Sequence, residues 1–127
     1  MSRHVLIVDD SRTEQHFLSE LMRKKGFTVA VAENGDQAMS ALEAGPRPDI
    51  ILMDVVMPGE NGFQLTRKIT KHADYSVIPV IICTSKNQAT DKVWAMRQGA
   101  KDFVTKPVNP AELLEKVDAV LKAASAN

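Results

Sequence analysis

The chain has 127 residues, which suits one compact domain, so residues 1–127 are expected to form a single domain with no output domain. Its 16 basic and 16 acidic residues balance, which gives no electrostatic footprint for nucleic acid or an anionic membrane. With one cysteine, no signal-like N-terminus and no run approaching the roughly 20 apolar residues that cross a bilayer, the sequence predicts a cytoplasmic protein.

Five short apolar runs are predicted to be strands. Most of them are continuous and rich in β-branched residues, a pattern typical of strands covered on both faces in a parallel sheet. The last run is short enough for an edge strand. The predicted strands are Val5–Val8, Thr28–Val31, Ile50–Met53, Val80–Cys83 and Phe103–Val104.

A segment with helical spacing follows each run. The first is expected to begin with a capping box, in which Ser11 accepts from the third helical amide and Glu14 reaches back. The alternation of strand and helix predicts an α/β fold, an open parallel sheet with helices on both faces. The five segments begin near Ser11, Asn34, Asn61, Asn87 and Asn109, and the fourth is expected to carry Val93, Trp94 and Met96.

Polar residues stand where four of the five strands end. Asp9 and Asp10 follow the first strand, and Asp54 follows the third; Thr84 and Lys106 stand at the ends of the fourth and fifth. Parallel strands share a direction, so these side chains should meet at one edge of the sheet, where open α/β sheets bind ligands.

These residue types indicate phosphoryl transfer. Three carboxylates in one crevice require either a proton or a cation, and magnesium accepts one or two carboxylates while keeping positions for phosphate oxygens. A lysine and a hydroxyl suit phosphate oxygens. Asp54 stands alone after a central strand, so it is the best-placed acceptor, whereas Asp9 and Asp10 form a pair fit to hold the metal.

The chain resembles the receiver domain of two-component response regulators over essentially its full length. The resemblance implies a flavodoxin-like fold in which five helices surround one doubly wound, five-stranded sheet of order 2-1-3-4-5, as in CheY. It rests on Val8-Asp9-Asp10, Leu52-Met53-Asp54 with Met57-Pro58 and Gly62, Thr84-Ser85, Gly99-Ala100 with Asp102-Phe103, and Lys106-Pro107.

The resemblance implies a role for each acidic residue. Asp54 would accept the phosphoryl group and, with Asp10 and the backbone carbonyl of Val56, would ligate Mg²⁺, with Mn²⁺ as an alternative. Asp9 would act mostly through water or as a neighbour of the metal.

It also implies how phosphorylation would be sensed. Thr84 and Lys106 would bind the phosphoryl oxygens, and Phe103 would change rotamer as Thr84 shifts. The Lys106–Pro107 peptide bond would be cis. Because Phe103 lacks a hydroxyl, any hydrogen bond that a tyrosine makes to a partner at this position would be lost.

The implied partners are a CheA-like histidine kinase as phosphodonor and a downstream protein that binds the fourth helix, fifth strand and fifth helix. The chain would be a switch rather than an enzyme, with only self-catalysed phosphotransfer and slow autodephosphorylation.

Segments 90–94 and 98–100 resemble stand-alone regulators of the chemotaxis type, in particular those of twitching motility. Val56 and Lys86 replace polar and acidic residues that help to place the hydrolytic water in flagellar CheY, so a fast loss of the phosphoryl group is not expected.

Two other functions fit parts of the pattern. A phosphate sink that drains a shared kinase would use the same site, and the sequence does not separate it from an effector. A phosphohydrolase of the haloacid-dehalogenase type would need an aspartate two residues after its nucleophile, where Val56 stands. The sequence also leaves two roles open for the Trp94 side chain: packing in the core, or contact with a partner.

Overall fold

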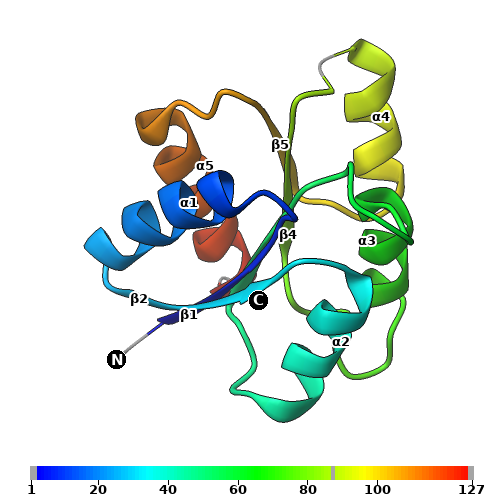
Figure 1. Ribbon diagram of the computed structural model, residues 1–127, viewed down its shortest axis with the longest axis horizontal. Helices are drawn as coiled ribbons and strands as arrows, with labels where there is room; N and C mark the ends of the chain where they lie inside the picture. The colour runs from blue at the N-terminus through cyan, green and yellow to red at the C-terminus, as the bar shows by residue number, and fades with distance from the viewer. Residues whose placement is uncertain (1–2, 87, 126–127) are drawn as a thin grey trace.

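A computed structural model describes residues 3–86 and 88–125 of the chain. Five strands alternate with five helices, and every predicted element is present (Figure 1). Four of the five strands extend one or two residues beyond the predicted ends. The elements are β1 (Arg3–Val8), α1 (Arg12–Lys24), β2 (Phe27–Ala32), α2 (Gly35–Ala44), β3 (Ile50–Met53), α3 (Gly62–Thr70), β4 (Val80–Thr84), α4 (Ala89–Arg97), β5 (Asp102–Thr105) and α5 (Pro110–Ser125).

The strands form one parallel sheet in the order β2-β1-β3-β4-β5, which confirms the predicted fold and the place of β5 at an edge. The expectation that strands are covered on both faces holds for the central β3 and β4, whose residues are all buried. It is wrong for β2, where only Phe27 and Ala32 are buried. An edge strand has no neighbour on one side, and β2 leaves part of its surface open.

The helices form a layer on each face of the sheet, with α1 and α5 on one side and α2, α3 and α4 on the other (Figure 1). Because successive side chains of a strand point to opposite faces, β1 contributes to both cores. Val5 and Ile7 pack with the core under α1 and α5, and Leu6 and Val8 pack with the opposite core. None of the described helices is long and apolar enough to cross a membrane.

Helix α4 is the least buried of the five. The predicted start near Asn87 lies outside the described residues, and the helix begins at Ala89. Ala95 is its only buried residue, whereas Trp94 is 49% exposed and Val93 and Met96 are exposed as well. Trp94 therefore does not fill the core, and the surface of α4 is unusually apolar.

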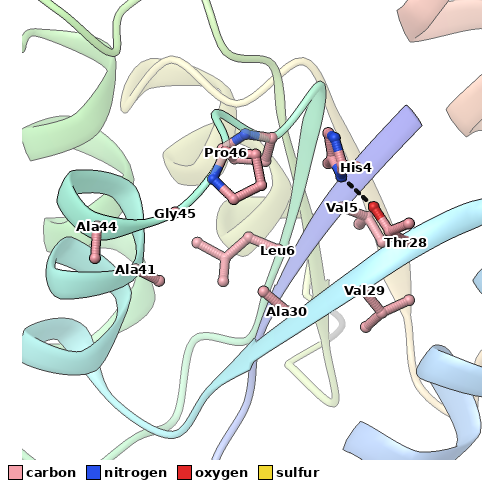
Figure 2. Close-up of a pocket in the computed structure, with 11 residues that line it drawn as sticks. His4, Val5, Leu6, Thr28, Val29, Ala30, Ala41, Ala44, Gly45 and Pro46 are labelled. Carbon is pink, nitrogen blue, oxygen red and sulfur yellow. Dashed lines mark hydrogen bonds between the residues drawn. The ribbon is translucent and has the colours of Figure 1, made fainter. Parts of the chain in front are cut away.

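Part of the surface of β1 and β2 beside α2 is left uncovered. A hollow of about 440 Å³ opens there, between small residues of α2 such as Ala41 and Ala44 and the strand residues Leu6 and Ala30 (Figure 2). The ring of His4 contacts the Thr28 hydroxyl beside this hollow. The hollow lies at the amino half of the strands, away from the strand ends that carry the predicted site.

Gly62 lets α3 begin directly against the end of β3. Its amide donates to the carbonyl of Val55 at 2.9 Å. A Cβ atom at this position would lie 1.9 Å from the carbonyl oxygen of Asp54. Only glycine permits this approach, so Gly62 helps to set where the chain leaves Asp54.

Gly62→Ala is expected to lower the free energy of unfolding by more than about 2 kcal/mol, because the new methyl group meets backbone rather than a movable side chain. Urea denaturation measures the change. Gly35→Ala is the matched control, since the tightest contact of its Cβ would be the flexible end of Glu60 at 3.0 Å. Equal stability of the two variants would contradict this account.

Candidate functional site

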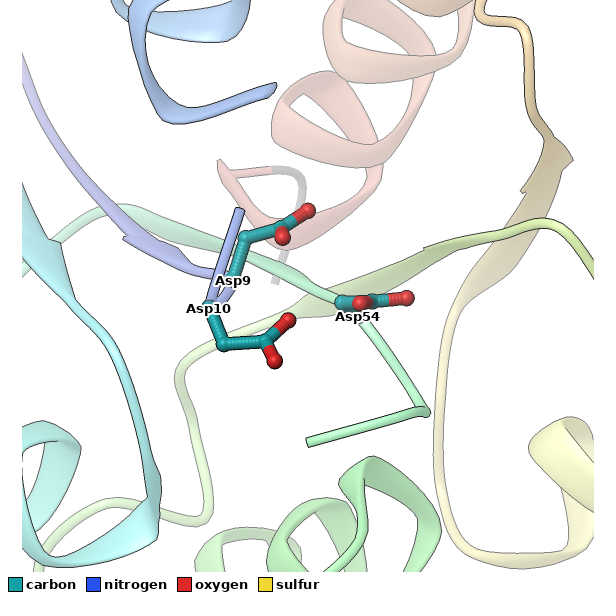
Figure 3. Close-up of side chains that lie close together, drawn as sticks. All are labelled: Asp9, Asp10 and Asp54. Carbon is teal, nitrogen blue, oxygen red and sulfur yellow. The ribbon is translucent and has the colours of Figure 1, made fainter. Parts of the chain in front are cut away.

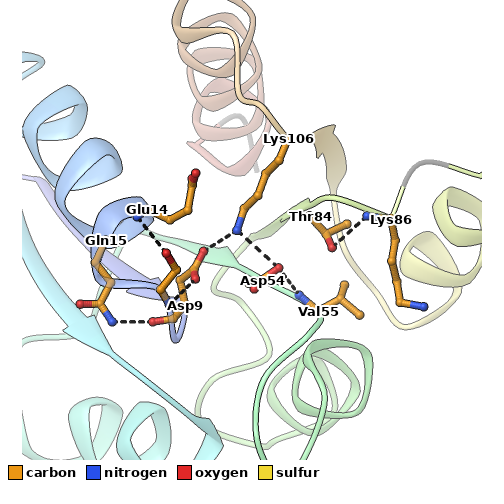
Figure 4. A network of polar contacts seen from close by, with 9 residues as sticks. Asp9, Glu14, Gln15, Asp54, Val55, Thr84, Lys86 and Lys106 are labelled. Atoms are coloured by element: carbon orange, nitrogen blue, oxygen red, sulfur yellow. Dashed lines mark hydrogen bonds and ion pairs between the residues drawn. The ribbon is translucent and has the colours of Figure 1, made fainter.

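The ends of β1, β3, β4 and β5 bring all the predicted polar residues to one edge of the sheet. The loop after β1 carries Asp9 and Asp10, and Asp54 follows β3 on the neighbouring strand. Thr84 is the last residue of β4, and Lys106 reaches in from the loop after β5 (Figure 4). Strand order reverses between β1 and β3, so the carboxylates stand at the switch point where such sheets bind ligands.

Three carboxylates converge at this switch point (Figure 3). One oxygen atom from each of Asp9, Asp10 and Asp54 lies within 4.8 Å of the others. Asp9 and Asp54 are buried, and Asp10 is exposed. Like charges this close in a partly buried place repel one another, so the cluster needs a counter-charge.

Lys106 supplies a positive charge inside the cluster. Its Nζ atom donates to Oδ2 of Asp9 at 2.7 Å and lies 3.6 Å from Oδ1 of Asp54. Burial alone would lower the pKa of Lys106, but the hydrogen bond to Asp9 and the charge of Asp54 outweigh it, and the net shift of the pKa is upward. Lys106 therefore stays charged. The Lys106–Pro107 bond is cis, as predicted.

The backbone holds the two buried carboxylates in place. Oδ1 of Asp9 accepts from the Ser11 amide at 2.9 Å. The Val55 amide donates to Oδ1 of Asp54 at 2.8 Å. Burial is the largest effect on the Asp54 carboxyl and raises its pKa, although the Lys106 charge acts in the opposite direction.

The predicted capping box of α1 is only half formed. Ser11 accepts from the Glu14 amide at 3.3 Å, as expected. The Glu14 side chain does not return to Ser11, because the Ser11 amide is bound to Asp9. The start of α1 thus serves the carboxylate cluster, and the pattern of residue types could not show this preference.

Two further predicted residues lie on the β4 and β5 side of the site. Thr84 is fully buried, and its hydroxyl oxygen accepts from the Lys86 amide at 3.3 Å (Figure 4). The hydroxyl hydrogen remains available to donate to a ligand oxygen. Phe103 is 6% exposed, so its ring faces inward.

Sequence reasoning missed two residues that support the site. The Gln15 side chain donates to the carbonyl of Asp9 at 2.6 Å. Lys116 of α5 donates to the carbonyl of Phe103 at 2.8 Å and lies 3.5 Å from Asp102, which ties α5 to β5. Both side chains bind backbone atoms that lie outside their own helix, and no sequence motif indicates such contacts.

The arrangement suits a hard divalent cation. The three carboxylates carry three negative charges against the single charge of Lys106, and only Asp10 faces solvent. Magnesium binds through few carboxylates, retains waters and leaves positions for phosphate oxygens. Among the described residues, the cluster contains no histidine or cysteine that would favour a softer metal.

Comparisons with known proteins agree with one another. A family model described as the response regulator receiver domain matches residues 5–118. PilH of Pseudomonas aeruginosa is 55% identical over 117 residues, which cover 92% of this chain and 96% of PilH. The DNA-binding response regulator MtrA of Mycolicibacterium smegmatis is 37% identical over 96% of this chain, and the chain spans 52% of its length.

Solved structures show the same architecture. A putative response regulator from Chloroflexus aurantiacus superposes with a TM-score of 0.90 at 29% identity, covering 96% of this chain and 99% of that one. The chemotaxis protein CheY4 of Vibrio cholerae gives a TM-score of 0.87 at 28% identity, covering 94% and 99%.

The cost of burying the charge of Asp54, to which the neighbouring Asp9 and Asp10 add, should be measurable as a gain in stability when Asp54 loses that charge. With a chelator present at neutral pH, Asp54→Asn is expected to raise the free energy of unfolding by on the order of 1 kcal/mol. The folded state raises the pKa of Asp54, so it binds the proton more tightly than the unfolded chain does. Wild type therefore regains stability as the pH falls through the pKa that Asp54 has in the folded state. The difference in free energy of unfolding between wild type and Asp54→Asn should narrow accordingly.

Urea denaturation at several pH values measures this gap. Asp36→Asn, which changes an exposed aspartate in the first turn of α2, is the control and should show no such narrowing. A wild type that is more stable than Asp54→Asn at neutral pH would contradict the stated balance of charges.

Proposed function

Because the chain belongs to the response regulator receiver domain family, we propose that it is a phosphorylation-dependent switch that accepts a phosphoryl group on Asp54. The observation that carries the proposal is the meeting of Asp54 with Asp9, Asp10 and Lys106 in one crevice. Each of these groups has a use in phosphoryl transfer, and no simpler structural role requires all of them together.

In the proposed reaction, the free Oδ2 atom of Asp54 attacks the phosphorus of a phosphohistidine. Oδ1 is held by the Val55 amide, which orients the carboxylate. The new oxygen–phosphorus bond forms as the nitrogen–phosphorus bond breaks, and the released imidazole takes up a proton. Lys106 and the Thr84 hydroxyl would contact the phosphoryl oxygens and offset their negative charge.

Magnesium would be held by Asp10, Asp54 and the backbone carbonyl of Val56, with Asp9 acting mostly through water. When bound, the cation supplies positive charge that the phosphoryl oxygens and the carboxylates share. Manganese, which also prefers oxygen ligands, is the alternative.

The signal would pass from Thr84 to Phe103 and then to a protein partner. Thr84 and Phe103 lie on neighbouring strands, and Phe103 is buried beneath the region between α4 and α5. We expect the partner to bind the face formed by α4, β5 and α5. Helix α4 exposes Val93, Trp94 and Met96, which offer apolar surface for binding. Phosphorylation would shift the balance between two arrangements of this surface.

The biological role that we propose is signalling of the chemotaxis or twitching-motility kind in the cytoplasm, with a CheA-like histidine kinase as donor. The similarity to PilH over nearly the whole chain supports a stand-alone receiver domain that spans residues 1–127. Apart from its own phosphotransfer and slow dephosphorylation the chain would not act as an enzyme. A phosphate sink is the alternative role, and binding of a partner by the beryllofluoride-loaded form would separate the two.

Incubation with acetyl phosphate and magnesium is expected to add one phosphoryl group, seen by intact mass measurement. Asp54→Ala should abolish the adduct, because it removes the attacking oxygen. Asp36→Ala, at an exposed position on α2, should leave it unchanged. An adduct that survives in Asp54→Ala would refute the acceptor assignment.

The phosphoryl group should be long-lived, since Val56 and Lys86 offer no side chain suited to orient a hydrolytic water. Both residues are exposed at the mouth of the site. The double variant Val56→Asn with Lys86→Glu is expected to lose its phosphoryl group about tenfold faster, a modest part of what general acid–base catalysis can supply. The decay of the adduct after removal of the donor measures this rate, and an unchanged rate would contradict the proposal.

A further inference from the structure

Glu14 is partly buried, and one of its carboxylate oxygens has no role in the proposed reaction. Its Oε2 atom is inaccessible to solvent and has no hydrogen-bond partner among the described residues. The expected capping-box contact is absent, because the Ser11 amide binds Asp9 instead. A buried carboxylate oxygen without a partner is costly, so its retention at this place calls for an explanation.

Lys106 is the positively charged group of the site that the charge of Glu14 affects. Figure 4 shows the Glu14 carboxylate turned toward Lys106 from the start of α1, on the side of Lys106 where Asp9 lies, whereas Asp54 lies on the other side. No ion pair within 4 Å joins Glu14 to Lys106 in the described part of the chain, where Lys106 pairs with Asp9 and Asp54. Burial lowers the pKa of Lys106, and the hydrogen bond to Asp9 and the charge of Asp54 raise it more. The charge of Glu14 adds to this upward shift from beyond ion-pair distance.

The Lys106 ammonium lies closer to Asp9 than to Asp54. Nζ of Lys106 is 2.7 Å from Asp9 but 3.6 Å from Asp54, so it rests toward the α1 side of the crevice. Asp9 attracts it there directly, and Glu14 adds a second negative charge on that side. The surroundings of Lys106 are largely buried, which leaves this charge less screened than at the surface.

We propose that Glu14 is a positioning residue for Lys106, holding the ammonium toward Asp9 and away from the place where it would contact a phosphoryl group on Asp54. The inference rests on the proposed function of Asp54 and adds a regulation of the same site. Glu14 thereby weakens the phosphorylated state. The contact between Lys106 and a phosphoryl oxygen forms only against the attraction of Glu14.

Binding of beryllofluoride with magnesium, a stable stand-in for the phosphoryl group, provides the test. Trp94, the single tryptophan, is a fluorescent reporter on α4, and calorimetry gives an independent reading. Glu14→Gln keeps the shape and removes the charge, and it is expected to tighten binding about threefold, the scale of one partly screened ion pair. Glu14→Met, of similar volume, should tighten binding as well, and thermal melting checks that both variants fold.

A double-mutant cycle separates action through Lys106 from other effects. In a Lys106→Met background, Glu14→Gln should leave the affinity unchanged, because the group that Glu14 positions is gone. Glu20→Gln, which removes the same charge from an exposed position on α1, should have no effect in either background.

An unchanged affinity in Glu14→Gln, an equal effect in Glu20→Gln, or an effect that persists without Lys106 would overturn the inference. Failure of wild type to bind beryllofluoride would instead refute the proposed function itself. The two failures are therefore distinguishable.

Discussion

Mutual repulsion among Asp9, Asp10 and Asp54 is the constraint on which the rest of the site depends. Their oxygens meet within 4.8 Å, and Lys106 is the only cation within 4 Å of them in the described ranges. Backbone amides donate hydrogen bonds to two of the carboxylates, which partly offsets the excess of negative charge. The excess negative charge of such a site favours the binding of a divalent cation. A cation bound there could also contact the oxygens of a phosphoryl group on Asp54.

Much of the fold could be predicted from the sequence because its signals are local. Continuous apolar runs predicted β3 and β4. The helix predicted to begin near Asn61 is α3, which starts with a complete capping box. The gathering of Asp54, Thr84 and Lys106 followed from the common direction of parallel strands. The strand-end positions also indicated Asp54 as the acceptor and a metal near Asp9 and Asp10. Family resemblance then fixed the individual roles, which stay predictions.

The sequence could not show what depends on competition between partners in space. Glu14 fits a capping box by type, yet Asp9 takes the amide that Glu14 would bind. The sequence placed Val93, Trp94 and Met96 on the fourth helix but left open whether Trp94 packs in the core. The structure exposes all three, since Ala95 alone faces the core. These departures lie in the site and on the proposed partner surface, where function rather than folding selects the residue.

The central claim is that Asp54 carries the phosphoryl group, and chemical reduction locates that group directly. Borohydride reduces an aspartyl phosphate to homoserine, and peptide mass spectrometry then identifies the converted position. After incubation with acetyl phosphate and magnesium, we expect homoserine at position 54 and at no other aspartate. Homoserine at position 9 or 10, or its absence from a protein that carries a phosphoryl adduct, would contradict the account.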